Sequence, residues 1–545
     1  MKKILCLVLA LLMIFTVLVA CTKKGEGTGD ATSAPIDGGD TDGGNGGNGD
    51  VDGDVDGSDS ISGSDADGSS DTDTTTESKE TNQWGEDKLT PGTEGEDLDF
   101  QGATIGIACR PETRYIREFG VETQADPVDM KIYQRNKAVE KELNVKIKLI
   151  GEATLWTATG IKDYVLQEQT AGVESEVDVV AAYGAYATTP LLRGCYVNLA
   201  DETQVSYLTL TNAYWNQSYI QAATCYNQLY YLVGDLNLTV YDKSIATFTN
   251  MDLARENEIN PDDLYAAVKS GDWTYDYMYT LVKDFSYLDG NENFTVDVGD
   301  IVPLATVSGS EGRDPFVSAW QLEMLKENDD GTHTITIDGN TKLEAACTKL
   351  INLYELEGVF LTSIEESFEW SFVGGKALFD FDIIYRNADS NTALRNCGFD
   401  YAILPLPKYD KDQQGYYTTP QDAYNTMSVT TTHEDKIDAI CATLELMCAK
   451  SYSDVRPFYI EKMVKATYVT GPDKVTMLDT AMAGSVFDTG TIYASQLEGF
   501  ISTIWRSATM NKITIAERWE AKRTAITTAV EDFDVWFAMM DPYAQ

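Results

Sequence analysis

The part of the chain after residue 98 predicts an α/β fold, and two observations carry this prediction. Apolar runs of strand length alternate there with segments whose apolar residues recur at helical spacing. Residues 99–545 are also long enough to bury a large core and to form two or more domains. In open α/β sheets ligands bind at the carboxyl ends of the strands, so a site is expected at those ends.

The alternation starts with a predicted strand, helix and strand. "GATIGIACR" (102–110) is an apolar run that ends in polar residues, and "DPVDMKIYQRNKAVEKELNVKIKLI" (126–150) continues as a helix and a second strand. "IKDYVLQEQTAG" (161–172) predicts the next helix, and "EVDVVAAYG" (176–184) predicts a short buried strand. This order is typical of a β-α-β beginning.

Later segments continue the pattern. Two extended runs are expected in "LYYLVGDLNLTVYDKS" (229–244), around Gly234 and Asp235. "GDWTYDYMYTLVKDF" (271–285) predicts a helix with Thr274 as its N-cap, and Trp273 is expected in the core. "GGKALFDFDIIYR" (374–386) predicts a turn, a strand and an exposed strand end, and "YNTMSVTTT" (424–432) predicts a strand followed by a helix over 433–450.

The N-terminus predicts export and lipid attachment. Two lysines precede an apolar run, Ile4 to Ala20, that ends in small residues and is typical of a secretory signal. The ending Leu18-Val19-Ala20-Cys21 resembles the lipobox of bacterial lipoproteins, which implies cleavage before Cys21 and a diacylglycerol on its sulfur. An ordinary signal peptide or an uncleaved anchor is the alternative. We therefore assign 1–20 to the signal peptide and expect the protein at the extracellular face of the cytoplasmic membrane.

Residues 21–98 contain Gly, Asp and Ser but few large apolar residues, so we expect a disordered acidic tether. Within it, Asp52, Asp54, Asp56 and Gly57 match the opening of an EF-hand loop. The twelfth position is Gly63 instead of a bidentate Glu, so a charged spacer is the better interpretation, and calcium binding or modification of the tether stays open.

Charge and composition exclude several classes of function. A net charge of −46 without clusters of Lys or Arg excludes nucleic acid and anionic lipid surfaces as partners. Seven cysteines follow the tether without CxxC spacing, so most are expected to be small buried side chains, and one or two disulfides stay open. His333 and His433 are expected at the surface, no metal or cofactor motif is complete, and nothing requires an enzyme. A pair of glycosidase carboxylates stays open because that arrangement is spatial.

Six stretches occur in an order that resembles a known family. They are "RNKAVEKELNVKI", "VDVVAAYGAYATTPLLRGCYVNLAD", "NQLYYLVGDLNLTVYDKSI", "SGDWTYDYMYTLVKDF", "FVGGKALFDFD" and "FDYAILPLPKYDKDQQGYYTTP". The chain from about residue 99 resembles the extracellular solute-binding proteins of ABC importers, in particular the carbohydrate-type family 1 that includes maltose-binding protein. The resemblance implies a two-lobe periplasmic-binding-protein-like type II fold with a hinge and a cleft between the lobes.

On this resemblance we divide residues 99–545 into two lobes. The first takes about 99–236 and 408–490, and the second takes about 237–407 and part of the C-terminal helices. The cleft closes about a solute because only the closed state contacts it from both sides. We expect a monomer that binds a sugar or oligosaccharide without a cofactor and delivers it to the permease. A surface glycan-binding lipoprotein, a receptor for peptides or other polar solutes and a secreted glycosidase are the alternatives.

The candidate ligand contacts combine aromatic rings with polar groups at predicted strand ends, which suits the C–H faces and hydroxyls of sugars. The resemblance points to Tyr385, with Asp382 beside it, as the aromatic that a strand end delivers to the sugar. For Trp320 and Trp505, core packing is an equal expectation. The full set is Arg110, Glu118, Tyr183, Tyr186, Asp235, Trp320, Asp382, Tyr385, Tyr424 and Trp505.

Overall fold

The fold is taken from a computed structural model of the chain. It describes residues 98–290, 292–293, 295–297, 299–362, 368–385, 393–465 and 471–540. The signal peptide, Cys21 and the tether with its aspartate-rich loop lie outside these residues. All described residues belong to one unit, Glu77–Gln545, within which the chain forms two lobes, each built around its own sheet.

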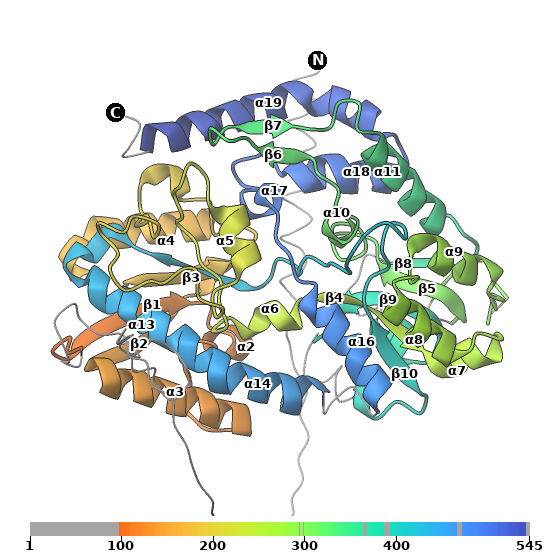
Figure 1. Cartoon of the computed structure of the whole chain (residues 1–545), viewed down its shortest axis with the longest axis horizontal. Coiled ribbons are helices and arrows are strands. Elements are labelled where there is room, and N and C mark those ends of the chain that lie inside the picture. The colour runs from red at the N-terminus through yellow and green to blue at the C-terminus, as the bar shows by residue number, and fades with distance from the viewer. Residues whose placement is uncertain are drawn as a thin grey trace, which may run out of the picture. The chain divides into compact units, whose positions relative to one another are not determined.

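The first sheet forms the core of the first lobe (Figure 1). Its strands, in spatial order, are β11 (Asn425–Val429), β3 (Val179–Tyr183), β1 (Ala103–Cys109) and β2 (Val145–Gly151). β1 is parallel to both β2 and β3, whereas β11 is antiparallel to β3. The predicted strands at 102–110, 176–184 and 424–432 are therefore confirmed.

Local sequence explains how β1 and β2 are joined. Asp126 caps α3 (Pro127–Leu143) by accepting hydrogen bonds from the N–H groups of Val128 (2.7 Å) and Asp129 (2.9 Å), and Pro127 occupies the first turn. Asn144 ends the helix in the left-handed conformation at φ 47° and turns the chain directly into β2. The predicted helix and second strand over 126–150 are confirmed.

The second sheet forms the core of the second lobe. In spatial order its strands are β10 (Tyr401–Leu404), β4 (Ile245–Asn250), β9 (Ala377–Ile383), β5 (Val302–Val307) and β8 (Phe360–Thr362). β4 is antiparallel to both its neighbours, while β5 is parallel to β8 and β9. β9 is buried throughout and Ile384 after it is buried as well, so the expected exposure does not begin at the end of the strand, whereas Tyr385 is half-buried; β4 pairs with β9 up to Ile383 and β5 pairs with it up to Phe381.

Helices pack on both sheets (Figure 1). Those of the first lobe are α2 (Thr113–Ile116), α3, α4 (Ala158–Ala171), α5 (Gln217–Ala223), α13 (Ile437–Lys450) and α14 (Arg456–Tyr459). The helices that follow in the chain, α6 before the first strand of the second lobe and the others after it, are α6 (Leu238–Asp242), α7 (Met251–Glu256), α8 (Pro261–Ser270), α9 (Tyr275–Asp284), α10 (Pro315–Ala319) and α11 (Thr341–Tyr354). Thr274 caps α9 through the N–H of Tyr277 and Trp273 is fully buried, as predicted.

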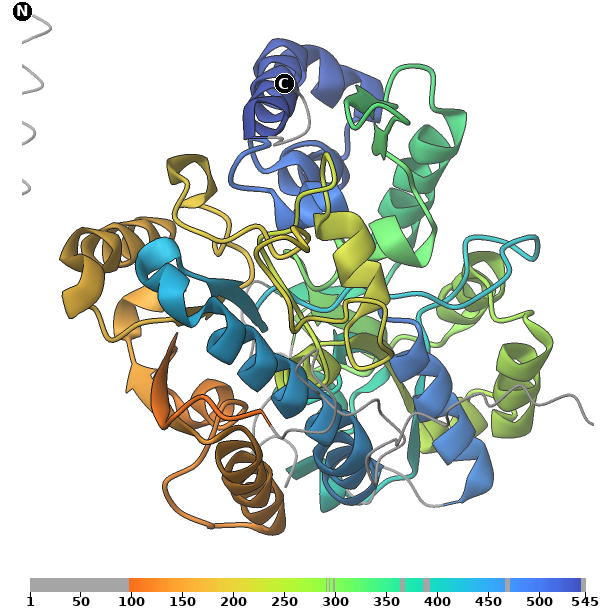
Figure 2. The ribbon, with the colours of Figure 1, turned by 60° about the vertical axis from the view of Figure 1, so that its left-hand side comes forward.

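The C-terminal helices are α16 (Pro472–Ala483), α17 (Thr489–Ile492), α18 (Ser507–Asn511) and α19 (Ile515–Met540). α19 lies beside the hairpin of β6 (Leu325–Glu327) and β7 (His333–Ile335), an arrangement that Figure 2 shows from a second direction. α16 packs against the second lobe, where Lys474 pairs with Asp400. It falls within 408–490, which the sequence assigned to the first lobe.

Three stretches of the described residues run between the lobes and are joined by backbone hydrogen bonds, and we call them the crossing segments. They comprise residues 235–245, 405–424 and 484–490. Neighbouring backbones are hydrogen-bonded: Gln421 N–H to the carbonyl of Lys243 (2.8 Å) and Thr418 N–H to that of Gly484 (2.9 Å). The expected second extended run in 229–244 is a short helix, α6, because the N–H of Thr239 in its first turn is bound by the Glu118 carboxylate.

Two expectations about single residue types have different outcomes. Six of the seven described cysteines are buried and all seven are free, as expected for small apolar side chains. The histidines, in contrast, are not at the surface. His333 Nδ1 lies 2.7 Å from Asp534 and His433 Nδ1 lies 2.7 Å from Asp178, and both imidazoles are buried because a carboxylate partner offsets their desolvation.

Candidate functional site

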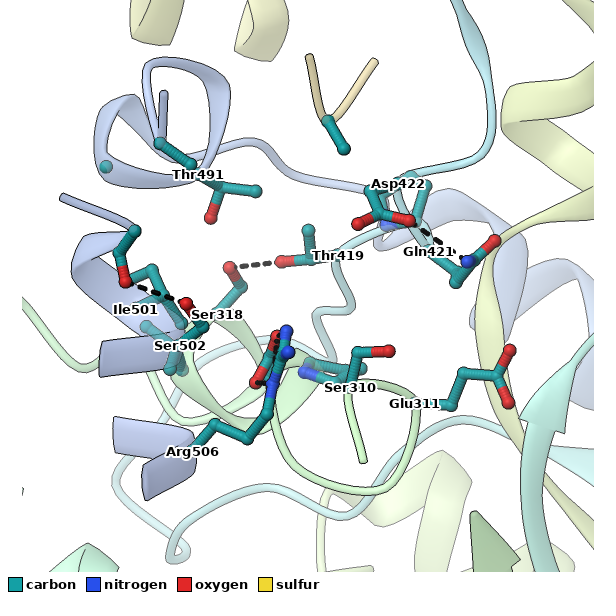
Figure 3. A pocket seen from close by; sticks show the side chains of 18 of the residues that line it. Ser310, Glu311, Ser318, Thr419, Gln421, Asp422, Thr491, Ile501, Ser502 and Arg506 are labelled. Atoms are coloured by element: carbon teal, nitrogen blue, oxygen red, sulfur yellow. Dashed lines mark hydrogen bonds and ion pairs between the residues drawn. The ribbon is translucent and has the colours of Figure 1, made fainter. Parts of the chain in front are cut away.

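A cavity of about 360 Å³ opens where the two lobes meet the crossing segments (Figure 3). Ala185 and Tyr186 reach it from the turn after β3, and Ser310 and Glu311 reach it from the loop after β5. The carboxyl ends of one strand from each sheet thus converge on it, which is the expected place for a site in this fold class.

The rest of the lining comes from α10, from all three crossing segments and from the C-terminal region. The residues with hydroxyl, amide or charged side chains are Ser310, Glu311, Asp314, Ser318, Thr419, Gln421, Asp422, Thr491, Ser495, Ser502 and Arg506. Tyr186 is the one aromatic residue of the described lining and its side chain is 40% exposed. The cavity is therefore built to exchange hydrogen bonds with a polar solute and offers a single ring for stacking.

Arg506 and Asp314 form an ion pair in the wall of the cavity. Arg506 Nε lies 2.9 and 3.0 Å from the two carboxylate oxygens of Asp314, and Nη2 makes a further bond to the same group. Burial raises the pKa of Asp314, and the guanidinium opposes this shift. The pair joins the start of α10 to the C-terminal region. Because Asp314 is so close, its carboxylate neutralises much of the positive charge of Arg506.

Asp422 presents a carboxylate to the cavity from the second crossing segment (Figure 3). Its Oδ1 accepts hydrogen bonds from Tyr183 Oη (2.8 Å) and from Gln421 Nε2 (3.0 Å). Burial raises the pKa of Asp422, and the bond from Tyr183 opposes the shift. Within the described residues no hydrogen bond to Oδ2 is formed, which leaves this oxygen to accept from a solute.

Glycine at position 184 allows the turn after β3 to lie close to the second crossing segment. A Cβ atom at Gly184 would lie 2.8 Å from the Tyr424 ring and 2.9 Å from the carbonyl oxygen of Asp422. Both distances are shorter than a van der Waals contact, so the turn after β3 can pack against the second crossing segment only without a side chain.

Arg110 lies next to the cavity lining without being part of it. Its guanidinium carbon is 3.6 Å from the ring centre of Tyr115 and 4.2 Å from that of Trp156. It donates to the side chain of Asn425 and to the carbonyl of Ala423, each at 3.0 Å. Burial lowers its pKa to about 10. Arg110 therefore holds the second crossing segment against the end of β1.

Glu118 also connects crossing segments. One carboxylate oxygen accepts from the N–H of Thr239 in the first crossing segment, and the other accepts from Asn425 Nδ2 at 2.6 Å, directly after the second. The carboxylate is fully buried, and burial raises its pKa to about 7.

Of the ten residues predicted to contact the ligand, Tyr186 lines the cavity and Tyr183 bonds to a lining residue. Asp235 forms an ion pair with Arg456 (2.9 Å), and the guanidinium carbon of Arg114 lies 5.1 Å from the ring centre of Tyr385. Arg110 and Glu118 lie outside the lining, as described above, and so do the last four, all of them buried: Trp320, Asp382, Tyr424 and Trp505.

Both tryptophans are fully buried, and their ring centres lie 6.4 Å apart. Trp320 donates its indole hydrogen to the carbonyl of Pro407 (3.1 Å), and Trp505 donates to that of Arg313 (2.8 Å). The sequence left ligand contact and core packing as equal expectations for these two tryptophans, and their positions are those of core residues.

Sequence reasoning missed most of the polar lining. Within residues 308–320 it named only Trp320, whereas Ser310, Glu311 and Asp314 of the loop and Ser318 of α10 line the cavity. The loop follows β5, so its place after a buried strand was the available signal. Arg506 had no such signal, because it stands beside a buried tryptophan in a helical segment.

No helix among the described residues is long and apolar enough to cross a membrane. No protein-family model and no curated protein matches the chain.

Solved structures do resemble the fold. The uncharacterized protein lmo0859 of Listeria monocytogenes EGD-e is 12% identical, with a TM-score of 0.50 over 78% of this chain and 100% of that one. The ABC substrate-binding protein Lmo0181 of Listeria monocytogenes, in complex with cycloalternan, is 14% identical, with a TM-score of 0.46 over 80% and 100%. The binding protein of B. animalis subsp. lactis Bl-04 with β-1,6-galactobiose is 14% identical, with a TM-score of 0.47 over 79% and 98%. Two of these neighbours are named as an ABC substrate-binding protein and an ABC transporter associated binding protein, and the likeness is one of fold.

Proposed function

We propose that this protein is the solute-binding component of an ABC importer and that it captures a sugar or oligosaccharide in the cavity between its lobes. The observation that carries the proposal is the lining itself. Hydroxyl, amide and carboxylate groups surround the space, and one tyrosine ring faces it. Sugars need acceptors and donors for their hydroxyls and an aromatic face for their C–H groups, and this lining supplies both.

Binding and closure follow from where the contacts originate. Tyr186 comes from the first lobe, Ser310 and Glu311 come from the second, and Asp422 lies on a segment between them. A solute that touches all of them favours the arrangement in which the lobes are close together, because only that arrangement offers every contact. The crossing segments are where the backbone would absorb such a movement.

Anchoring and delivery are part of the same proposal. A diacylglycerol on Cys21 would hold the protein at the membrane, and residues 21–98 would act as its tether. Attachment raises the effective concentration of the receptor at a permease, an advantage that a freely diffusing protein lacks.

The proposal is tested by a thermal-shift screen of the purified chain against sugars of increasing length, amino acids and peptides. A ligand that binds the native state raises the melting temperature by mass action. Stabilisation by one class of sugar without turnover supports the proposal, and stabilisation by peptides alone would replace the sugar with a peptide.

A glycosidase is the competing function, because Glu311, Asp314 and Asp422 place three carboxylates around one cavity. Incubation of the stabilising sugar with the protein, followed by chromatography of the products, separates the two. Release of shorter sugars that is lost in the Asp422→Asn variant would overturn the binding-protein proposal.

A further inference from the structure

The C-terminal helix α19 runs from the second lobe to the first (Figure 1). Its 26 residues span about 39 Å, which exceeds the diameter of a small domain. No residue of α19 belongs to the described lining of the cavity, so the proposed solute contacts leave this helix without a role. Its contacts with each lobe indicate what it does.

The first half of α19 is attached to the second lobe by carboxylates. Glu344 of α11 accepts hydrogen bonds from the first two backbone N–H groups of the helix, at 3.1 and 2.6 Å. Asp338, shortly before α11, accepts from Trp519 Nε1 (3.1 Å) and from Arg523 Nη2 (2.7 Å). Hydrogen bonds to ionised acceptors are the stronger kind, so this half of the helix is fixed to the second lobe.

The hairpin of β6 and β7, which the chain forms between α10 and α11, supports the helix further along. Asp534 of α19 accepts from the backbone N–H of His333 (2.9 Å), and its other oxygen lies 2.7 Å from Nδ1 of the same histidine. The imidazole is buried in this contact. Helix and hairpin are therefore expected to move together with the second lobe.

The last turns of α19 reach the first lobe. Gln228 Nε2 donates to the carbonyl of Phe537 (2.8 Å), and the ring centre of Tyr230 lies 5.9 Å from that of Trp536 and 6.2 Å from that of Phe537. Gln228 and Tyr230 belong to the first lobe, because the chain two residues further on is hydrogen-bonded to β11. We call Gln228, Tyr230, Trp536 and Phe537 the grip.

A tight turn precedes α19 at the point where the chain changes lobes. Before the turn, Gln496 Nε2 donates to the carbonyl of Thr188 in the first lobe (2.6 Å). After it, Trp505 is bonded to the loop before α10 in the second lobe. Between them, Glu498 (φ 54°) and Gly499 (φ 62°) both have left-handed backbones, which non-glycine residues rarely adopt. Such a turn between two fixed segments is a natural place for a rotation.

α19 also supports one wall of the cavity. Ser502 and Arg506 line the cavity, and Arg518 of α19 donates to the carbonyl of Thr503 beside them (2.7 Å). A movement of the helix with the second lobe therefore carries these lining residues along and widens the cavity on the side of the first lobe.

We propose that α19 is a strap that holds the two lobes in their closed arrangement and is released at the grip when they open. The grip is the contact that parts, because it consists of a hydrogen bond between neutral groups and of ring contacts, whereas three carboxylates fix the helix to the second lobe. The chain then turns about Glu498 and Gly499. The inference concerns movement of the lobes and holds for any solute of the proposed receptor.

Pulsed electron paramagnetic resonance on the purified chain without solute tests the strap. Spin labels are attached through a keto-bearing amino acid at Gln167 of α4 and Glu256 of α7, one exposed position on each lobe, so the native cysteines stay unmodified. Trp536→Ala removes a ring from Tyr230, and Gln228→Ala removes the hydrogen bond of the grip. Each is expected to lower the ratio of short to long distances about twofold to tenfold.

Two further variants control for damage to the helix. Val535→Ala is the matched control, because Val535 precedes Trp536 in the same turn and is 58% exposed. It should leave the distances unchanged. Trp536→Phe keeps a ring against Tyr230 and should restore most of the wild-type distribution. Thermal unfolding of each variant shows that the fold is retained.

The outcomes separate the strap from the proposed function. Unchanged distances in both grip variants would overturn the inference, and so would an equal shift in Val535→Ala. A shift confined to the two grip variants and reversed by Trp536→Phe supports it. If no sugar stabilises the protein in the thermal-shift screen, the carbohydrate function loses its support, while the distances in the solute-free protein still decide whether α19 is a strap.

Discussion

Tyr183 and Asp422 join the end of β3 to the second crossing segment through a hydrogen bond of 2.8 Å. The bond fixes the carboxylate at its Oδ1 oxygen, while Oδ2 receives no hydrogen bond from the described residues. The ring centre of Tyr183 also lies 5.4 Å from the guanidinium carbon of Arg110. Arg110 donates hydrogen bonds to the carbonyl of Ala423, the residue after Asp422, and to the side chain of Asn425. The solute-facing carboxylate is therefore held by side chains of the first lobe and not by the loop alone.

Asp422→Asn is expected to weaken solute binding about tenfold to a hundredfold. A hydrogen bond to a charged acceptor contributes about 1.5–3 kcal/mol, while the amide oxygen of Asn can still accept from Tyr183 and preserve the fold. Calorimetric titration with the sugar that gives the largest thermal shift measures the change. Asp435→Asn, at an exposed position of the first lobe, serves as the control. Unchanged affinity in Asp422→Asn would remove the carboxylate from the site.

Tyr186→Ala is expected to reduce affinity by about 0.5–1.5 kcal/mol with little change in the melting temperature of the free protein. The ring lines the cavity and is 40% exposed, so its loss removes a stacking face without opening a hole in the core. Tyr186→Phe keeps the ring and should bind like the wild type. If Phe and Ala weaken binding equally, the hydroxyl and not the ring makes the contact.

Trp320→Ala is expected to lower the free energy of unfolding by about 3–5 kcal/mol, because the side chain is fully buried against Trp505 and Phe316. Urea denaturation of the ligand-free protein measures this loss. Trp370→Ala removes a tryptophan that is 46% exposed and should cost far less. A Trp320→Ala protein of normal stability with lost solute binding would restore Trp320 to the ligand contacts.

The stability of the protein is expected to fall as the pH rises from about 5 to about 7, and Glu118 is one cause. Burial raises its pKa from 4.5 to about 7, so across this window the folded state keeps a proton that the unfolded state has lost. The contribution is fully present below pH 4.5 and is lost as the pH passes 7, by an amount on the order of 3 kcal/mol.

Glu118→Gln cannot titrate, so its free energy of unfolding should change less with pH than that of the wild type. Urea denaturation at pH 5, 6, 7 and 8 gives the two slopes, and Glu174→Gln, at an exposed position, is the matched control. Other buried carboxylates contribute to both proteins, so the difference between the slopes is the quantity to compare. Parallel slopes would show that Glu118 is ionised in the folded state across this range.

Cys21→Ser is expected to move the protein from the membrane fraction to the soluble fraction of the producing cells, because the serine cannot carry the thioether-linked diacylglycerol. Fractionation followed by immunoblotting measures the shift. Cys6→Ser lies within the apolar run and should leave the protein with the membrane. Retention of the Cys21→Ser protein at the membrane would favour an uncleaved N-terminal anchor.

The sequence by itself determined the local structure of the first lobe. Asp126, Pro127 and Asn144 specify the ends of α3, and the apolar runs on either side become β1 and β2. These features depend on neighbours in the chain, so a single sequence suffices to predict them. The α/β class and the two lobes followed from repeating the same signals, together with the family resemblance.

Only the tertiary structure decided which polar residues face the cavity. Glu311, Asp422 and Arg506 are far apart in the sequence and are brought together by the crossing segments and the C-terminal helices. The abundance of aromatic residues was a weak guide, because most of these rings pack in the core, where their large apolar area is buried, and Tyr186 alone among the described lining residues presents a ring to the cavity. Whether a side chain packs in the core or lines the cavity depends on which distant segment covers it, and no local pattern records that choice.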